Sequence, residues 1–160
     1  MLRKIADLPF ALCAAPLYLH RAGEPAEVGE LGDHDCLLNT NDPVWYLRRA
    51  GHDVHLKVND PVYSSNSYQT LRKAALAGRG IGLLPIRLVR DELGDGRLVR
   101  VLPDCEVPDR PLYALYAPGG QTLARVQLFL DFVTDWFRRQ ARSQPSAPVQ
   151  PGAEAGSRSA

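Results

Sequence analysis

Hydrophobic residues in the first third of the chain occur in short runs, each closed by proline, glycine or a polar cluster. These runs predict a strand at 10–15, a short helix at 16–20, a second short helix at 26–31 and a strand at 36–38. A polar loop at 39–43 follows the second strand. Short strands that alternate with short helices are typical of an α/β domain.

A β-hairpin is predicted at 44–58, with its turn at 49–51. Val54, Leu56 and Val58 alternate with polar residues, so they should point to the same face of the second arm. On the first arm, Trp45 and Leu47 have the same spacing and should share that buried face.

The stretch 64–85 carries the clearest helix signals. Asn66 and Gln69 have the spacing of a capping box, which predicts a helix that runs to about Ala77 and is closed by Gly78. Arg72 is expected to face water together with Lys73. The residues expected on the buried face are Tyr68, Leu71, Ala74 and Ala75.

The second half of the chain continues the alternation. Strands are predicted at 81–84, 98–102 and 112–116, with helices at 86–93 and from 122 or 123 to about 140. We interpret the apolar stripe of the last helix as core, and it consists of Val126, Phe129, Leu130, Val133, Trp136 and Phe137. Residues 141–160 lack periodicity and predict a disordered tail. The pattern as a whole predicts a largely parallel sheet.

Composition excludes some functions and favours one compartment. The formal net charge is +1, which by itself would attract neither DNA nor an anionic membrane. No apolar run is long enough to cross a bilayer. Arg3 and Lys4 begin a segment like a signal peptide, but Asp7 and Pro9 interrupt it. The 3 cysteines are widely spaced, which favours free thiols in the reducing cytoplasm and no metal site.

Two polar clusters follow predicted strands, at 39–42 and 64–67. Ligands of α/β sheets bind beyond the carboxyl ends of strands and at helix N-termini, so both clusters are candidate positions. The serines and Asn66 have two interpretations: they cap a helix, or they bind an anion such as a carboxylate.

Enzyme chemistry finds little support in the sequence. The glycines at 78–82 leave a helix and enter a strand, which reverses the order of a dinucleotide-binding loop. The acid, imidazole and thiol of 33–36 are neighbours in sequence, and we interpret them as loop residues rather than a nucleophile pair. We therefore predict neither catalysis nor a cofactor.

Residues 65–103 contain the runs SNS at 65–67, LRKAALAGRGIGLLP at 71–85 and LGDGRLVRVLP at 93–103. In combination these runs resemble the effector-binding domain of LysR-type transcriptional regulators. Three flanking segments fit the same family: LCAAPLYL at 12–19, PLYALY at 111–116 and the closing helix. The resemblance therefore covers about residues 3–139.

The resemblance implies a periplasmic-binding-protein-like (type 2) α/β fold with a small effector between two lobes. It implies that 1–16 forms a crossover strand of lobe one, 17–108 lobe two, and 109–140 the return strand and last helix of lobe one. The residues expected at the effector are Asn39, Thr40, Ser64, Ser65, Asn66, Ser67 and Pro85.

The expected partner is a small-molecule effector, such as a small carboxylate. The family is homo-oligomeric and contacts DNA through a winged helix-turn-helix, which we expect to be missing here because the chain resembles only part of such a regulator. Alternatives are a stand-alone solute-binding protein of the same fold, an enzyme centred on 33–36, and a gene fragment without function.

Overall fold

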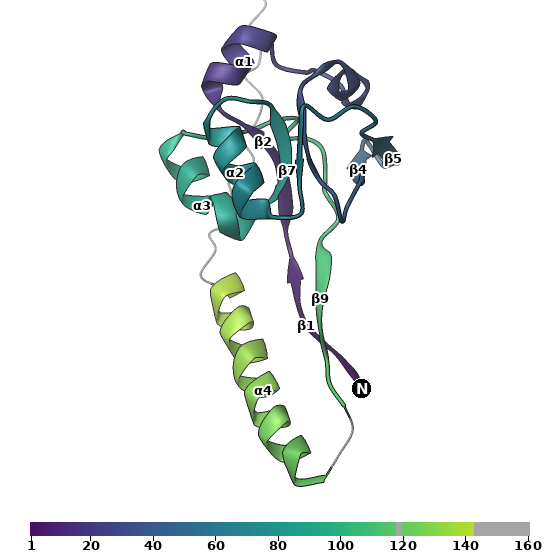
Figure 1. Ribbon diagram of the computed structural model, residues 1–160, viewed down its shortest axis with the longest axis vertical. Coiled ribbons are helices and arrows are strands. Elements are labelled where there is room, and N and C mark those ends of the chain that lie inside the picture. The colour runs from purple at the N-terminus through teal and green to yellow at the C-terminus, as the bar shows by residue number, and fades with distance from the viewer. Residues whose placement is uncertain (118–119, 143–160) are drawn as a thin grey trace, which may run out of the picture. The chain divides into compact units, whose positions relative to one another are not determined.

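The computed structural model describes residues 1–117 and 120–142, with side chains described except at 120–123 and 142. The elements are β1 (Leu2–Leu8), β2 (Phe10–Ala14), α1 (Pro16–Ala22), η1 (Val28–Asp33), β3 (Cys36–Asn39), β4 (Val44–Arg49), β5 (His52–Lys57), β6 (Tyr63–Ser65), α2 (Tyr68–Leu76), β7 (Ile81–Pro85), α3 (Ile86–Asp95), β8 (Val99–Arg100), β9 (Arg110–Leu115) and α4 (Gly120–Arg142) (Figure 1).

The chain divides into two compact units. One unit comprises 7–112, and the other comprises 1–6 together with the described residues from 113 onward. These boundaries differ from the lobe boundaries at 16 and 108 that the resemblance implies, because β2 is a central strand of the larger unit's sheet. The assignment of segments to family lobes stays a prediction.

The larger unit is built on a five-stranded sheet with the order β6-β3-β7-β2-β8. β3 is parallel to both β6 and β7, while β2 is antiparallel to β7 and to β8. The sheet is therefore largely parallel, as predicted, and among its described strands only β2 runs the other way. The carboxyl ends of β6, β3 and β7 consequently meet at one edge.

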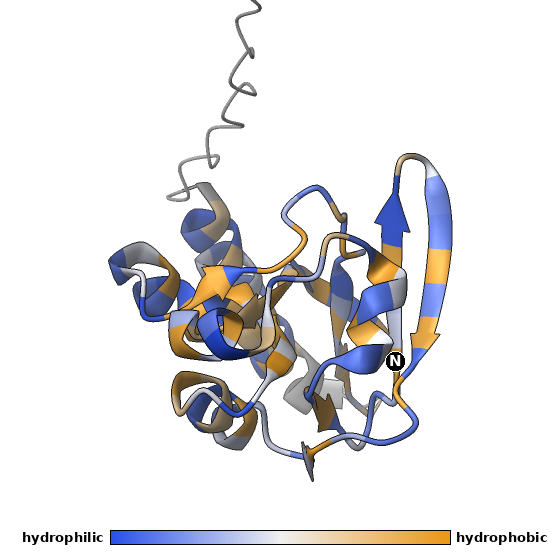
Figure 2. Cartoon of the chain, turned by 90° about the horizontal axis from the view of Figure 1, so that it is seen from above, coloured by the Kyte–Doolittle hydropathy of each residue, from blue (hydrophilic) through white to orange (hydrophobic). Residues whose placement is uncertain are grey.

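Alternation along the strands sends side chains to two separate cores. Phe10, Leu12 and Ala14 of β2 pack on one face, together with Trp45 and Leu47 of the hairpin. On the opposite face, the buried set consists of Cys13, Ala15, Leu37, Leu84 and Leu98 with Leu71 and Ala75 of α2 and Val89 of α3. Figure 1 shows α2 and α3 on one side of β2 and β7, and in Figure 2 the central strands are mainly orange while the helices carry both colours.

The hairpin forms where the alternation predicts it. Trp45 and Leu47 are both 1% exposed, and Val54 and Leu56 of β5 pack against the same core. The turn residues Ala50 and Gly51 have φ angles of 49° and 78°, the positive values that a two-residue hairpin turn requires.

Several local expectations need correction. The predicted helix at 26–31 is a 3₁₀ helix, Val28–Asp33, and the predicted strand at 98–102 is reduced to Val99–Arg100. The capping box at Asn66 is wrong: α2 begins at Tyr68 with Ser67 as N-cap, and no side chain caps it. The reason is that the Ser67 N–H donates to Ser65 Oγ at 3.1 Å, which forms a turn before the helix.

Arg72 does not face water as predicted. Its guanidinium forms an ion pair with Glu92 of α3, whose side chain is only 1% exposed. Arg97 lies 3.7 Å from the same carboxylate. A carboxylate buried next to a partner on another helix is invisible in the periodicity of either helix.

The smaller unit pairs β1 with β9, and the Arg3 side chain donates to Asp131 of α4 at 2.6 Å. Leu130 is buried, but Phe129 is 64% exposed and Trp136 is 40% exposed. The prediction that the whole α4 stripe is core is therefore wrong for these two residues. A two-stranded sheet has too little surface to cover every apolar position of a helix of 23 residues.

The predicted tail falls almost wholly outside the described residues, which end at 142. No helix among residues 1–117 and 120–142 is both long and apolar enough to cross a membrane.

Candidate functional site at the carboxyl ends of β3 and β6

Four of the predicted ligand-binding residues are neighbours in the structure. Asn39 pairs with Ser65 and Leu38 pairs with Ser64, because β3 and β6 are parallel and in register. The Thr40 N–H donates to the Ser65 carbonyl at 3.1 Å, which extends the pairing beyond the strand end. Residues that are 25 or 26 positions apart in the sequence thus share one edge of the sheet.

Asn39 fixes the loop that follows β3. Its side chain is 5% exposed, and its Oδ1 accepts the Asn41 N–H at 3.0 Å while its carbonyl accepts the Asp42 N–H at 2.9 Å. The side-chain oxygen is therefore used inside the protein, as in an Asx turn. This geometry gives Asn39 a positioning role, with Thr40 and Asn41 exposed at the tip.

The start of α2 faces the same edge. Ser67 is half-buried at the N-cap, and Asn66 and Ser64 are exposed. The Ser67 carbonyl accepts the N–H groups of Thr70 and Leu71, but no side chain caps the N–H groups of the first turn. Such groups carry partial positive charge and are suited to an anionic ligand.

Pro85 lies at the end of β7, one strand further along the sheet. It pairs with Phe10, and the adjacent Ile86 N–H donates to the Pro9 carbonyl at 2.9 Å. The Pro85 side chain is half-buried and offers only an apolar surface. Its predicted role in ligand binding stays a prediction.

A cationic group that the sequence analysis missed lies beside this edge. Arg110, at the start of β9, forms an ion pair with Asp42 of the loop after β3 and donates to Tyr68 Oη at 3.0 Å. Its Cζ is 4.3 Å from the centre of the Phe10 ring, a cation–π contact. Phe10 and Tyr68 in turn contact each other edge to face, with ring centres 5.4 Å apart.

The surroundings of Arg110 alter its chemistry. Its side chain is 27% exposed, and burial lowers the pKa of its guanidinium from the ordinary value. Burial also raises the pKa of the Tyr68 phenol, so this group keeps its proton at neutral pH. Because Tyr68 accepts from Arg110, its own O–H can still donate. The cluster of Phe10, Asp42, Tyr68 and Arg110 therefore offers a cation and a neutral donor together.

No local sequence pattern marks Arg110, which stands between Asp109 and Pro111 and lies between the strands predicted at 98–102 and 112–116. Its partners Phe10, Asp42 and Tyr68 come from three other segments of the chain. Only the tertiary structure brings these segments together.

The acid–imidazole–thiol segment has no catalytic arrangement. The Cys36 thiol is buried and donates to the Leu31 carbonyl at 3.3 Å, and burial raises its pKa to about 11. His34 instead contacts Tyr18 Oη through Nδ1 at 3.0 Å. A protonated, buried thiol is a poor nucleophile. Among the described residues, no group of three or more His, Cys, Asp or Glu side chains could hold a metal ion.

The sheet, with polar loops at its carboxyl edge and a partly buried cation beside them, has the architecture of α/β domains that bind ligands beyond the carboxyl ends of their strands. A family profile, the LysR substrate binding domain, matches residues 2–138. The chain therefore belongs to the LysR substrate-binding domain family, and its fold is the periplasmic-binding-protein-like type 2 fold predicted from the sequence.

Related proteins are transcription regulators. The chain is 28% identical over 137 residues to the HTH-type transcriptional activator AaeR and 30% identical over 133 residues to TtdR, both of Escherichia coli K12. These matches cover 84% and 81% of the chain but only 44% and 42% of the two regulators. The chain thus spans less than half of their length.

Solved structures agree with this assignment. Full-length AphB, a virulence activator of Vibrio cholerae, is 30% identical with a TM-score of 0.74, over 86% of this chain and 48% of AphB. The regulatory domain of an AphB variant, C227S, from Vibrio vulnificus is 31% identical with a TM-score of 0.73, over 84% of this chain and 72% of that domain.

Proposed function

We propose that this chain is the sensing part of a LysR-type transcriptional regulator and that it binds a small carboxylate at the edge formed by β3, β6 and the start of α2. The observation that carries the choice of ligand is the Arg110 cluster. A guanidinium that is already paired with a carboxylate, Asp42, has the geometry to pair with a carboxylate ligand.

The neighbouring groups support the same ligand. The uncapped first turn of α2 adds N–H donors without adding negative charge. Tyr68 supplies a hydroxyl donor, and the Phe10 ring restricts where the Arg110 guanidinium can lie. A small carboxylate with a short apolar or hydroxylated body fits these groups best.

The regulatory role is proposed from the family. In full-length LysR-type regulators the effector domain works with an N-terminal DNA-binding domain, in homo-oligomers, in the cytoplasm. We propose the same setting for this chain, with effector binding controlling transcription through the DNA-binding domain. No catalytic step is proposed, because its relatives are transcription regulators and the Cys36 thiol is buried.

The test is a titration of this chain with acetate, benzoate and succinate, followed by backbone amide NMR. At least one acid should shift the amides of Asn41, Ser65 and Tyr68, and Arg110→Gln should weaken its binding at least tenfold. Arg90→Gln, which removes an exposed arginine of α3, should bind like the wild type. Unmoved amides with all three acids, or wild-type affinity in Arg110→Gln, would overturn the proposed site.

A further inference from the structure

Exposed apolar side chains are concentrated in the smaller unit. Most of the large hydrophobic side chains that are exposed among the described residues belong to it, although it contains the smaller share of those residues. Four of them lie on α4 and are between 40% and 71% exposed: Leu128, Phe129, Phe132 and Trp136. We call these four residues the outer stripe of α4. Single exposed hydrophobic residues are normal on a protein, but a contiguous set marks an interaction surface.

The outer stripe lies on a different side of α4 from the residues that pack inward. Phe129, Phe132 and Trp136 are separated by three and four positions, the spacing of neighbours on a helix surface. Leu130 and Thr134 are buried, and Thr134 Oγ1 donates to the Leu130 carbonyl at 2.6 Å. The helix therefore has two apolar sides, and no described part of the chain covers the second one.

The β1–β9 sheet also has an uncovered face, but this face suits a partner less well. Tyr113 and Leu115 are exposed and alternate with more buried neighbours on β9, and Leu2 and Lys4 do the same on β1. Lys4 puts a charged residue among the apolar ones, and charged residues are depleted from the centres of interfaces. The outer stripe of α4 contains no charge.

The outer stripe has the area that a stable dimer needs. A large aromatic side chain buries roughly 150–250 Å², so Phe129, Phe132 and Trp136 leave roughly 350 Å² in water, and Leu128 brings this to about 450 Å². Two such stripes would bury about 900 Å² of apolar surface. A standard interface of about 1,600 Å² is a little over half apolar, which is also about 900 Å².

The charges beside the stripe do not oppose self-association. Asp131 is paired with Arg3 at 2.6 Å, and Asp135 is paired with Arg138 at 3.4 Å. Both pairs form within one copy of the chain. Two α4 helices can therefore approach each other without bringing unpaired carboxylates together.

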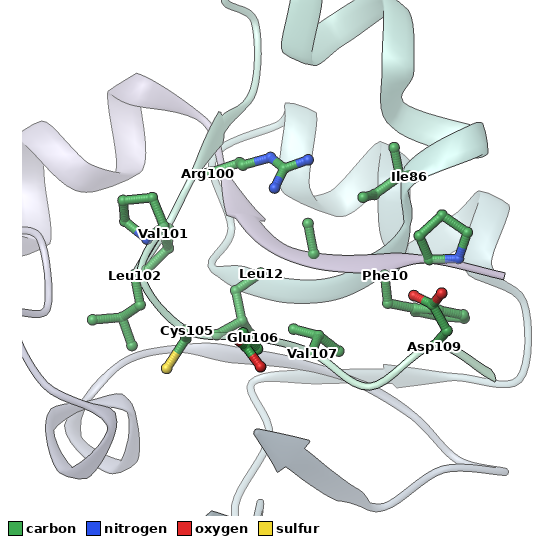
Figure 3. A pocket seen from close by; sticks show the side chains of 13 residues that line it. Phe10, Leu12, Ile86, Arg100, Val101, Leu102, Cys105, Glu106, Val107 and Asp109 are labelled. Carbon is green, nitrogen blue, oxygen red and sulfur yellow. The ribbon is translucent and has the colours of Figure 1, made fainter. Parts of the chain in front are cut away.

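The larger unit directs its apolar side chains mainly to its own core. Figure 3 shows a cavity of about 310 Å³ that lies beside β2 and β8. The apolar side chains around it include Phe10, Leu12, Val101 and Leu102, which are only 2–7% exposed. A partner would gain little apolar burial from these side chains, in contrast to the outer stripe.

We infer that two copies of this chain form a symmetric dimer in which the outer stripes of their α4 helices face each other. A twofold contact uses the same surface patch on both partners, so one uncovered stripe on each copy is sufficient. The three aromatic side chains should contribute most, because they lose the most apolar surface. The dimer is independent of the proposed effector site, to which α4 contributes no residue.

Sedimentation equilibrium of the 160-residue chain between 1 and 500 μM tests the dimer. The mass should rise from 17.6 kDa toward twice that value. In a matching NMR dilution series, the amides of 128–136 should shift while those of 36–40 stay in place. A mass that stays at 17.6 kDa throughout would overturn the inference. A mass that rises beyond the dimer would also overturn it, because an open-ended assembly needs a second, different surface.

Variants at exposed positions locate the contact. Glutamine is a good helix former, so Phe132→Gln should fold, and it should weaken the dimer by about tenfold or more. The double variant Phe129→Gln with Phe132→Gln should stay monomeric over the same concentrations, with an unchanged far-UV circular dichroism spectrum. Leu115→Gln, on the uncovered sheet face, is the control and should dimerise within about twofold of the wild type. A dimer that persists in the double variant, or one that is lost in Leu115→Gln, would contradict the assignment to α4.

Discussion

Arg110 and Asp42 form an ion pair that joins the start of β9 to the loop after β3. Asp42 thus places a carboxylate where the proposed effector would place its own. The pair holds the loop, through Asp42, against a guanidinium that also contacts Tyr68 and Phe10. An effector carboxylate has to compete with Asp42 for the same donors.

Removing that internal competitor should strengthen effector binding. Asp42→Asn is expected to raise the affinity for a bound monocarboxylate such as benzoate by about tenfold, because the effector no longer has to displace a charged group. Isothermal titration calorimetry measures this directly. The control is Asp60→Asn, an exposed aspartate in the segment before β6, which should leave the affinity unchanged. Weaker binding by Asp42→Asn would mean that Asp42 orients Arg110 instead.

The ion pair between Glu92 and Arg72 should make stability depend on pH. The hydrogen bond from Arg72 holds the pKa of the Glu92 carboxyl below its ordinary value of 4.5. Because the pKa of Glu92 is lower in the folded state, the ionised carboxylate stabilises the protein above about pH 4.5. The protein loses this stabilisation as the pH falls through the folded-state pKa. The wild type should therefore lose stability steeply below pH 4.5.

Glu92→Gln removes the titrating group. At pH 7 it should cost about 2 kcal/mol of unfolding free energy, and the loss of stability in acid should become shallower. Urea unfolding between pH 3 and pH 7 measures both effects. Glu27→Gln, an exposed glutamate, should keep the wild-type profile. If the unfolding free energy of Glu92→Gln falls with pH as steeply as that of the wild type, other carboxylates cause the acid dependence.

Two glycines should respond in opposite ways to the same substitution. A Cβ at Gly80 would lie 2.2 Å from the Asp35 carbonyl oxygen, which accepts the Ile81 N–H at 2.8 Å, so Gly80→Ala must distort the entry into β7. We expect a loss of at least about 2 kcal/mol. Gly94 lies in α3 with open space around it, so Gly94→Ala should gain about 0.5–1 kcal/mol. Chemical denaturation compares the two, and equal effects would contradict the packing at Gly80.

The cysteines should label slowly and in a fixed order. Burial raises the pKa of Cys13 to about 12 and that of Cys36 to about 11, so both remain protonated thiols at neutral pH. Cys105 is only partly buried. Iodoacetamide at pH 7.5, followed by peptide mass spectrometry, should modify Cys105 first and the other two only after unfolding in urea. Fast labelling of Cys36 in the folded chain would revive the enzyme interpretation of 33–36.

The sequence determined those features that rest on local periodicity. Alternation in 52–58 and the apolar spacing of 44–48 were enough for the hairpin, and the polar residues after two short strands pointed to Asn39, Thr40 and 64–67. β3 and β6 are in register as neighbouring parallel strands, which brings those residues together. The family could also be inferred from the runs at 71–85 and 93–103, and the matching profile confirms it.

Tertiary structure decided what depends on contacts between distant segments. Arg110 is partly buried and paired only because Phe10, Asp42 and Tyr68 come from distant segments to contact it. In the same way, Arg72 pairs with Glu92 of another helix. The start of α2 moved to Tyr68 because a serine turn competed with the expected cap. The antiparallel direction of β2 depends on its pairing with β7, which no local pattern contains. The exposure of Phe129 and Trp136 likewise depends on how much surface the neighbouring strands offer to the helix.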